Sequence, residues 1–226
     1  GDGFPAEQGL NPNLNRHQQM TMNSIGLLCI TCSYLIGAIP FGLVLSRGSG
    51  IDIRAEGSKN IGATNVTRLL GKKLGTLTLL CDLLKGYLPM LIATHLLQGT
   101  SAPHLTLALC GAASVLGHLF PIYLRFKGGK GVATALGAFL FLEPLAVLGC
   151  LLVFIASVYF SGYVSLGSLL GSVSIVLWLP LLHAPNWKLW LAAGIVALIW
   201  IKHAQNIGRL MNGTEKTWKR KDEAKT

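Results

Sequence analysis

Two glycine-rich, basic segments carry the residues of this chain that are best suited to chemistry. The first is GSKNIGATNVTR, Gly57 to Arg68, and the second is FKGGKG, Phe126 to Gly131. Glycine lets backbone N–H groups approach a ligand closely, and lysine or arginine adds positive charge beside them. That combination suits phosphate. Two such segments in one chain indicate two phosphate-bearing substrates.

The first segment differs in composition from an ordinary basic loop facing acidic lipid headgroups. A loop of that kind needs Lys and Arg, whereas this one interleaves glycine with side chains that donate hydrogen bonds. We therefore favour a ligand site here, with charge supplied by Lys59 and Arg68. The polar and glycine residues that would bind the ligand are Ser58, Asn60, Gly62, Thr64 and Asn65.

The second segment encloses a lysine between glycines. It is not a Walker A motif, because the G-x-x-x-x-G-K-S/T spacing is absent, but backbone N–H groups at a helix start would bind phosphate in a related way. Interfacial lysines are commonly snorkelling anchors, an explanation that fits Lys127 better than Lys130. The candidate binding residues are Lys127, Gly128, Gly129, Lys130 and Gly131.

Two further polar pairs follow long apolar runs. His203 and Asn206 are three residues apart and share a face if the segment is helical. The alternative is an interfacial histidine that only anchors the helix. Ser165 and Ser168 flank a glycine and either bind ligand or permit close helix packing.

Three ionisable residues lie inside or beside apolar runs. Asp82 and Lys85 can pair at their spacing of three residues, and we interpret them as a structural ion pair that supports the site. His118 is either a functional group or the donor of a helix-to-helix hydrogen bond. Catalytic signatures of soluble enzymes, such as G-x-S-x-G and H-E-x-x-H, are absent from the sequence.

The elements that must position these residues are apolar helices. Hydrophobic residues make up 51% of the 226 residues and charged residues only 12%, against about 25% in soluble domains. This composition, together with a mean hydropathy of +0.54, predicts an all-α, polytopic integral membrane protein. The seven apolar segments expected to form its transmembrane helices are Ile25–Leu45, Leu74–Leu97, Leu105–Leu124, Val132–Leu142, Leu145–Phe160, Leu166–Leu182 and Leu189–Ile201.

Two of these segments, the fourth and the fifth, are short or partial for a span of about 20 residues. Glu143-Pro144 separates them, and the proline ends the helix there. The pair forms either a tight helical hairpin or two re-entrant helices.

The distribution of positive charge predicts the orientation in the membrane. The net charge is +10, and sixteen of the nineteen Lys and Arg residues fall in the connections 47–73 and 125–130 and in the tail from residue 202. If all seven segments cross, these regions share the cytoplasmic side, with the N-terminus outside and the C-terminus inside. The charge therefore needs no nucleic-acid partner to explain it.

Three regions divide the chain. Residues 1–23 are polar and predict a disordered N-terminal extension, natural or added; residues 24–215 form the membrane domain; residues 216–226 form a basic cytoplasmic tail. The five cysteines lie in apolar runs, and their odd number argues against a disulfide framework. Cys29 and Cys32 have the C-x-x-C spacing of some metal and redox sites, but we interpret them as small apolar residues on one face of a membrane helix. No zinc-ligand spacing is present, and no cofactor is expected.

Four stretches together resemble a known family. GSKNIGATNVTRLLGKK, GHLFPIYLRFKGGKGVATALG, SGYVSLGS and HAQNIGRLMNGTE are similar to the signature stretches of the bacterial acyl-phosphate:glycerol-3-phosphate acyltransferases, the PlsY family. The resemblance runs in order from about Ile25 to Glu215. It implies seven membrane helices in the bacterial inner membrane and an active site on the cytoplasmic side.

The resemblance also implies the reaction. A fatty acyl group moves from acyl-phosphate to the 1-hydroxyl of sn-glycerol 3-phosphate, which gives lysophosphatidic acid and phosphate and begins phospholipid synthesis. Coupling to an enzyme that makes acyl-phosphate is expected. By position, the residues that contact substrate or act in catalysis would be Ser58, Asn60, Thr64, Arg68, Lys130, Ser165, His203 and Asn206.

Two departures from the family pattern stand out. Lys59 replaces a small glycine between Ser58 and Asn60, and Ala204 stands where a basic residue often follows the histidine. Neither changes a residue proposed to act in catalysis.

The expected mechanism is direct attack by the glycerol hydroxyl, because no base is identifiably paired with Ser58 as a nucleophile. His203 would be the base or another donor, and a substrate phosphate is the alternative base. The main alternative function is a transporter of an organic phosphate or other anion, with a non-catalytic scaffold third. A transporter would place its site near the bilayer midplane, usually between repeats.

Overall fold

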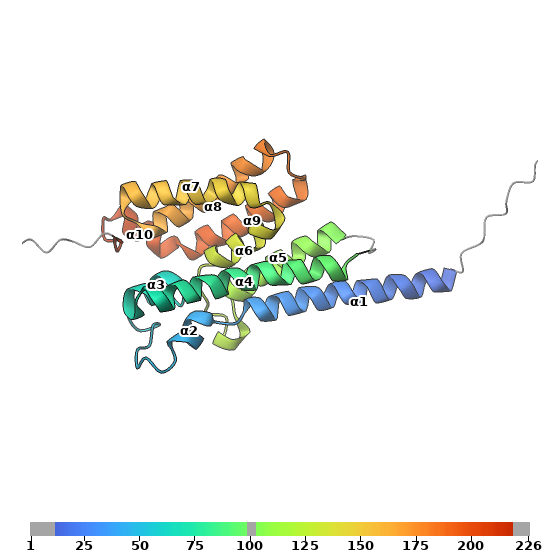
Figure 1. Cartoon of the computed structure of the whole chain (residues 1–226), viewed down its shortest axis with the longest axis horizontal. Coiled ribbons are helices and arrows are strands. Elements are labelled where there is room, and N and C mark those ends of the chain that lie inside the picture. Colours follow the sequence, from blue (N-terminus) through green and yellow to red (C-terminus); the bar gives the residue numbers. More distant parts are fainter. Residues whose placement is uncertain (1–11, 99–102, 219–226) are drawn as a thin grey trace, which may run out of the picture.

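The computed structural model describes residues 12–98 and 103–218, and their regular secondary structure is entirely helical (Figure 1). The elements in chain order are α1 (Pro12–Gly37), α2 (Phe41–Ser46), α3 (Ala63–Leu70), α4 (Lys72–Leu96), α5 (Pro103–Leu119), the 3₁₀ turn η1 (Ile122–Leu124), α6 (Val132–Leu142), α7 (Pro144–Ser161), α8 (Val164–Leu181), α9 (Asn186–Lys202) and α10 (Ala204–Met211).

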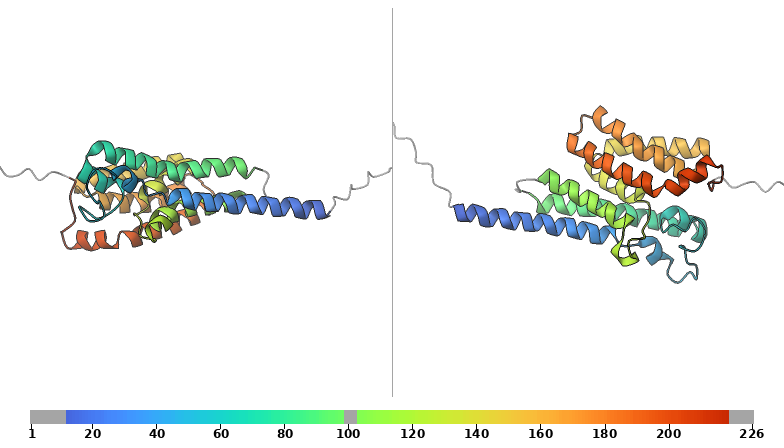
Figure 2. Two further views of the ribbon diagram at one scale, coloured as in Figure 1. Left: turned by 90° about the horizontal axis from the view of Figure 1, so that it is seen from below. Right: turned by 180° about the vertical axis from the view of Figure 1, so that it is seen from behind.

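Two groups of helices lie on either side of α6. In one group α1 packs along α5 and α4 contacts both; in the other, α7 packs along α8 and α8 contacts α9. α6 contacts α4 on one side and α7 on the other (Figures 1 and 2). The long helices run roughly parallel, and α3 and α10 lie at one end, opposite the start of α1.

The first predicted helix is broken. We predicted one helix over Ile25–Leu45, but α1 ends at Gly37 and α2 begins at Phe41. Pro40 explains the break, because proline has no N–H to donate and restricts the residue before it. The carbonyl of Ile39 that the break exposes accepts a hydrogen bond from Lys85 Nζ at 2.8 Å. A neighbouring helix therefore satisfies the backbone group that the break releases.

The start of α1 also differs from prediction. We expected residues 1–23 to lack structure, whereas α1 already begins at Pro12, so residues 12–23 are helical. Proline suits the first turn of a helix, since its missing N–H would have no partner there, and the polar residues that follow do not interrupt a helix that the apolar stretch continues. Residues 1–11 lie outside the described part of the chain.

Length and composition support fewer spans than seven. Among the described residues, five helices are long and apolar enough to cross a membrane, or six if α9 and α10, bent by 59°, form one broken span. α7, which we predicted to be short, has 18 residues and qualifies. α6 has 11 residues, roughly 16 Å, about half the hydrocarbon thickness of a bilayer. Whether it completes a seventh crossing stays a prediction.

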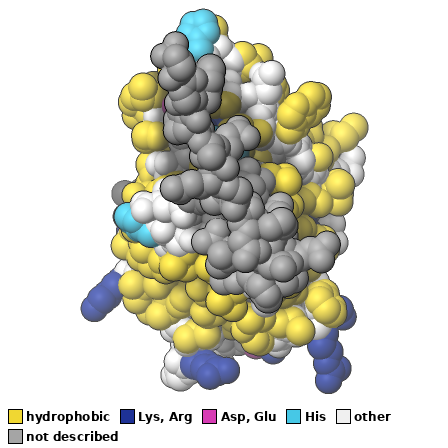
Figure 3. Space-filling view, turned by 90° about the vertical axis from the view of Figure 1, so that its right-hand side faces the viewer, with side chains coloured by type: hydrophobic (Ala, Val, Ile, Leu, Met, Phe, Trp, Pro, Cys, Tyr) yellow, Lys and Arg dark blue, Asp and Glu magenta, His cyan; other side chains and the backbone are white. Residues whose placement is uncertain are grey.

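Charge is distributed unevenly between the two ends of the molecule. Around the residues drawn in grey, the visible surface at the end where α1 begins is mainly hydrophobic, with Lys and Arg only near the edge of the view (Figure 3). The connection before α3, which holds Arg47, Arg54 and Lys59, and helix α10, which holds Arg209, lie at the opposite end (Figure 1). The basic connection before α3 and the start of α1 therefore lie at opposite ends of the molecule.

Small residues bring α6 close to α4. A side-chain carbon added to Gly86 would collide with the carbonyl of Thr134, and one added to Gly137 would collide with the carbonyl of Leu83. Backbone-to-backbone packing of this kind is how helices associate in lipid, where the hydrophobic effect does not drive them together. The short α6 is thereby held against α4.

We predict that Gly137→Ala lowers the apparent melting temperature in detergent, because its methyl group meets backbone that cannot swing aside. Overpacking of this kind costs about 1–3 kcal/mol. Gly194→Ala is the matched control, since no atom lies near the added carbon in α9 and alanine favours the helix. Equal melting temperatures for the two variants would contradict the close packing of α4 and α6.

Candidate active site

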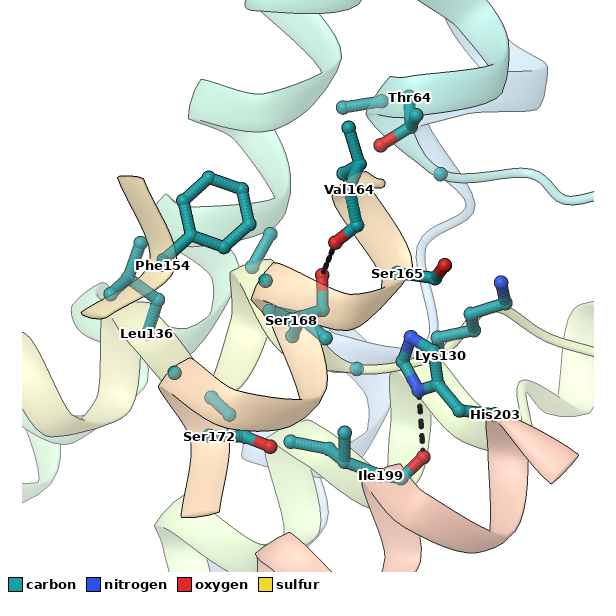
Figure 4. A pocket seen from close by; sticks show the side chains of 18 of the residues that line it. Thr64, Lys130, Leu136, Phe154, Val164, Ser165, Ser168, Ser172, Ile199 and His203 are labelled. Carbon is teal, nitrogen blue, oxygen red and sulfur yellow. Dashed lines mark hydrogen bonds between the residues drawn. The ribbon is translucent and has the colours of Figure 1, made fainter. Parts of the chain in front are cut away.

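One elongated cavity of about 300 Å³ lies between the two groups of helices. Its lining comes from the loop before α3, from α3 to α10 and from the segment after α10. Figure 4 shows part of this lining, from α3, α6, α7, α8 and α9. Polar residues gather at the end near α3 and α10, among them Arg68, Lys130 and His203. The other end is apolar and includes Phe139, Ile175 and Ile195. The volume is in the range of sites for small ligands.

Four helices begin at the polar end. The first residues of α3, α6 and α8 (Ala63, Val132 and Val164) line the cavity, as does Asn206 in the first turn of α10. None of these four helices has a side-chain cap at its N-terminus. The positive ends of these helix dipoles therefore face one space, which favours an anion.

The loop before α3 is shaped by one buried side chain. Asn65 Oδ1 accepts the N–H of Ser58 at 2.7 Å, and its Nδ2 donates to the carbonyls of Ile53 at 2.9 Å and Glu56 at 3.2 Å. Asn65 borders the cavity, but its amide is occupied by these bonds. Its structural contribution is to fold the loop so that Ser58 faces the cavity.

A hydrogen-bonded network links the polar residues of distant segments. Lys130 Nζ donates to Asn206 Oδ1 at 2.5 Å, and Asn206 Nδ2 donates to Glu215 Oε1 at 2.7 Å. The same carboxylate accepts Ser165 Oγ at 2.9 Å and Arg209 Nε at 2.7 Å. Glu215 therefore joins α6, α8 and α10 around the cavity.

Burial controls the charge on Lys130. Desolvation lowers the pKa of this lysine to about 8; Glu215 opposes the shift, and the charges of Arg209 and Arg68 add to it. For Glu215, burial by itself would raise the pKa, but hydrogen bonds from Arg209, Asn206 and Ser165 outweigh burial and hold the pKa below its ordinary value. Lys130 is thus mostly protonated at pH 7, but its pKa lies only about one unit above that pH.

The tautomer of His203 follows from its buried partner. Its Nδ1 lies 2.8 Å from the carbonyl oxygen of Ile199, and a carbonyl can only accept, so in the neutral ring Nδ1 carries the proton. Nε2 then has a free lone pair. Figure 4 shows the ring at the cavity beside Lys130, with Ser165 nearby on α8. A neutral histidine held this way can accept a proton from a substrate hydroxyl.

Most residues predicted from the sequence meet at this cavity. The lining includes Ser58, Asn60, Gly62, Thr64, Asn65, Arg68, Lys130, Gly131, Ser165, His203 and Asn206. Ser165 and Ser168 both line it, but Ser168 donates to the Val164 carbonyl of its own helix. Four predicted binding residues do not line it: Lys59, Lys127, Gly128 and Gly129.

Sequence reasoning missed the segment that follows α10. Glu215 and Lys216 line the cavity, Lys216 Nζ donates to the Gly57 carbonyl at 2.7 Å, and the N–H of Trp218 donates to Gly162 at 2.7 Å. We predicted a separate tail from residue 216, but residues 216–218 are tied to the site by these bonds; residues 219–226 lie outside the described chain. The NGTE stretch was the only signal that could have indicated Glu215.

Comparisons with known proteins agree with one another. Residues 27–213 match the family model described as glycerol-3-phosphate acyltransferase. A protein of that name from Desulfotalea psychrophila is 61% identical over 189 residues, which cover 84% of this chain and 96% of the relative. Another, from Aquifex aeolicus, is 43% identical over 189 residues, which cover 84% and 97%.

Two solved structures are also similar. Both are crystal structures of PlsY (YgiH), an integral membrane glycerol 3-phosphate acyltransferase. The glycerol 3-phosphate form has a TM-score of 0.81 and 42% identity, covering 86% of this chain and 96% of that one. The lysophosphatidic acid form has a TM-score of 0.78 and 42% identity, covering 85% and 94%.

We predict that anion binding weakens as the pH rises through about 8, because Lys130 loses its proton there. Sulfate is a suitable probe, since its charge is constant over this range. Titration calorimetry of the purified protein between pH 7 and 9 measures the effect. Lys130→Arg should remove the pH dependence, because arginine stays protonated. An unchanged profile in that variant would contradict the assignment to Lys130.

Proposed function

The chain belongs to the glycerol-3-phosphate acyltransferase family, and from that premise we propose that it transfers a fatty acyl group from acyl-phosphate to the 1-hydroxyl of sn-glycerol 3-phosphate. The products are lysophosphatidic acid and inorganic phosphate. The observation that carries the proposal is one cavity with cations and helix N-termini at one end and apolar side chains at the other. The reaction requires the polar, cationic end and the apolar end to meet at the carbonyl carbon of the acyl group.

The polar end has to hold two phosphate groups that repel each other. Arg68 and Lys130 would supply positive charge, and Ser58, Thr64 and Asn206 would orient the oxygens as neutral donors. The N–H groups at the starts of α3, α6, α8 and α10 add donors that need no reorganisation when charge develops. Fixed donors of this kind stabilise both the carbonyl oxygen and the departing phosphate.

The acyl chain would lie in the apolar end. The lining there comes from α6, α7, α8 and α9, through Phe139, Val147, Ile175 and Ile195. Each buried methylene contributes about 0.8 kcal/mol, so a long chain would bind mainly through this region. The reacting carbonyl would then sit where the apolar lining meets Lys130 and His203.

In the chemical step, the glycerol hydroxyl oxygen attacks the acyl carbonyl carbon and the bond to the phosphate oxygen breaks. The hydroxyl proton goes to His203 Nε2 or to a phosphate oxygen of a substrate. Phosphate is a good leaving group, so positioning and charge stabilisation supply most of the catalysis. Ser58 acts as a donor in this scheme, because no hydrogen-bonded base accompanies its hydroxyl in the described residues.

The protein is an integral, multi-pass membrane protein. We propose that it resides in the bacterial inner membrane with the polar end of the cavity at the cytoplasmic face, where the basic segments gather. Soluble glycerol phosphate would arrive from the cytoplasm. An enzyme that makes acyl-phosphate would have to supply the donor, since mixed anhydrides are short-lived in water.

The transporter alternative fits less well. A transporter binds its substrate near the bilayer midplane between repeats, whereas the cations here gather at one end of the cavity. Family membership also favours the enzyme.

We predict that purified protein given acyl-phosphate and glycerol 3-phosphate releases phosphate and forms lysophosphatidate. Arg68→Ala and Lys130→Ala should each lower kcat/KM by about 10²–10³-fold, the loss typical of one charge-stabilising donor. Arg47→Ala, an exposed cation outside the cavity, is the control and should match the wild type. No product from the wild type, or equal rates in all variants, would refute the proposal.

We also predict that no acyl-enzyme forms. Wild-type protein incubated with acyl-phosphate alone and denatured rapidly should show only its unmodified mass. Ser58→Ala should then retain single-step transfer at a reduced rate rather than lose it, because the hydroxyl only orients substrate. An ester-linked acyl group on Ser58 in the quenched wild type would contradict direct attack.

A further inference from the structure

A buried charged cluster lies beside the active site without belonging to its polar end. Asp82 and Lys85 on α4 and His118 on α5 are 2%, 3% and 5% exposed. Lys85 Nζ lies 2.9 Å from Asp82 Oδ1, and His118 Nδ1 lies 3.7 Å from the same oxygen. Charges at membrane depth are costly, so their presence calls for a functional explanation.

The cluster faces the same cavity as the site. Asp82 and His118 both line it, together with Lys130. Asp82 Oδ1 is paired with Lys85 Nζ at 2.9 Å, whereas His118 Nδ1 is buried and has no hydrogen-bond partner within the part of the chain that is described. The 3.7 Å between His118 Nδ1 and Asp82 Oδ1 is longer than a hydrogen bond. A small movement of the imidazole or the carboxylate would bring the two atoms within hydrogen-bond distance. The cluster is therefore close enough to influence the site and is not fully satisfied without it.

His118 is in direct contact with the turn that carries Lys130. The His118 carbonyl accepts the N–H of Gly129 at 3.0 Å. A side-chain carbon on Gly129 would collide with Nε2 of His118, and one on Gly128 would collide with the His118 carbonyl. The Nε2 edge of the imidazole thus packs against backbone one residue before Lys130. This explains why the two glycines are required although neither lines the cavity.

The cluster is anchored at its far side as well. Lys85 Nζ donates to the Ile39 carbonyl at the break between α1 and α2, and Lys85 holds Asp82. From there the contacts run through His118 to Gly129. Three separate segments of the chain are connected in this way to the residue that precedes the catalytic lysine.

We propose that His118, supported by Asp82 and Lys85, is a positioning residue that fixes the Gly128–Gly129 turn and so holds the Lys130 ammonium group on the substrate phosphate. The inference rests on the proposed function, in which Lys130 binds phosphate. A turn with two glycines has no side chains of its own to fix it, and the imidazole supplies that support. A misplacement of about 1 Å at a catalytic group can cost about a hundredfold in rate.

A double-mutant cycle tests whether His118 acts through Lys130. His118→Ala should lower kcat/KM by about a hundredfold in the wild type, but by less than about twofold in a Lys130→Ala background. Binding of sn-glycerol 3-phosphate, measured by calorimetry, should show the same non-additivity. Equal losses in both backgrounds would overturn the inference, since His118 would then act independently of the lysine.

A second pair of variants tests the contact itself. Gly129→Ala should impair the wild type, because its methyl group meets the imidazole, whereas in a His118→Ala background the same change should be tolerated or partly restore activity. Gly129 has an ordinary negative φ, so alanine is otherwise permitted there. Equal impairment of both backgrounds by Gly129→Ala would overturn the proposed contact.

Controls separate positioning from stability. Ser114→Ala removes a buried hydroxyl of α5 that bonds only within its own helix, and should leave kcat/KM unchanged. If His118→Ala does not fold, His118→Gln and His118→Asn replace it, and glutamine, whose amide reaches the Nε2 position, should retain more activity than asparagine. Equal activity of those two would count against the inference.

The proposed function and the inference fail in different ways. A wild type that neither binds glycerol 3-phosphate nor acylates it would remove the proposed function, and with it the role of Lys130. A wild type that does both, while the His118 and Lys130 variants are strictly additive, would overturn the positioning role alone.

Discussion

Backbone polar groups released at a helix break near a membrane must find partners, and the architecture of this protein depends on how they are found. Away from the cavity, side chains of other helices supply them. Lys85 bonds the Ile39 carbonyl at the break between α1 and α2, and Lys188 bonds the Leu142 carbonyl and Glu143 between α6 and α7. At the cavity four helices begin without side-chain caps, as α2, α4, α7 and α9 also do, but these four N-termini face a space that a ligand can enter. An anionic substrate is the partner that these N–H groups would take.

The same arrangement would let one site bind the water-soluble and the lipid substrate of the proposed reaction. Helix starts must lie where a polar ligand can reach them, and apolar helix faces must meet where lipid can enter. The short helix α6 is held against α4 by the close packing at Gly86 and Gly137. Its N-terminus therefore lies at the boundary between these two environments. Lys130 precedes that N-terminus by two residues. The lysine that we propose to act in catalysis is thus placed where the acyl carbonyl and the substrate phosphates would meet.

Glu215 is the carboxylate that balances charge at the polar end of the cavity, next to Lys130 and Arg209. Burial lowers the pKa of Lys130 to about 8, and Glu215 opposes that shift while it also accepts hydrogen bonds from Ser165, Asn206 and Arg209. Low dielectric makes each of these interactions stronger than in water. The segment after α10 therefore contributes to the electrostatics of the site and also fixes the relative positions of α8 and α10.

The sequence by itself determined the class of fold, most helix positions and the polar residues that gather at the cavity. Apolar periodicity and length are local properties, so Val132–Leu142 was predicted with its observed bounds. The tertiary structure decided what depends on contacts between distant segments. Glu215 reaches Ser165 across 50 positions, Asn65 turns inward to shape its loop, and His118 packs on Gly129. No local pattern encodes these contacts, because burial and packing assign each side chain a role only after the helices have assembled.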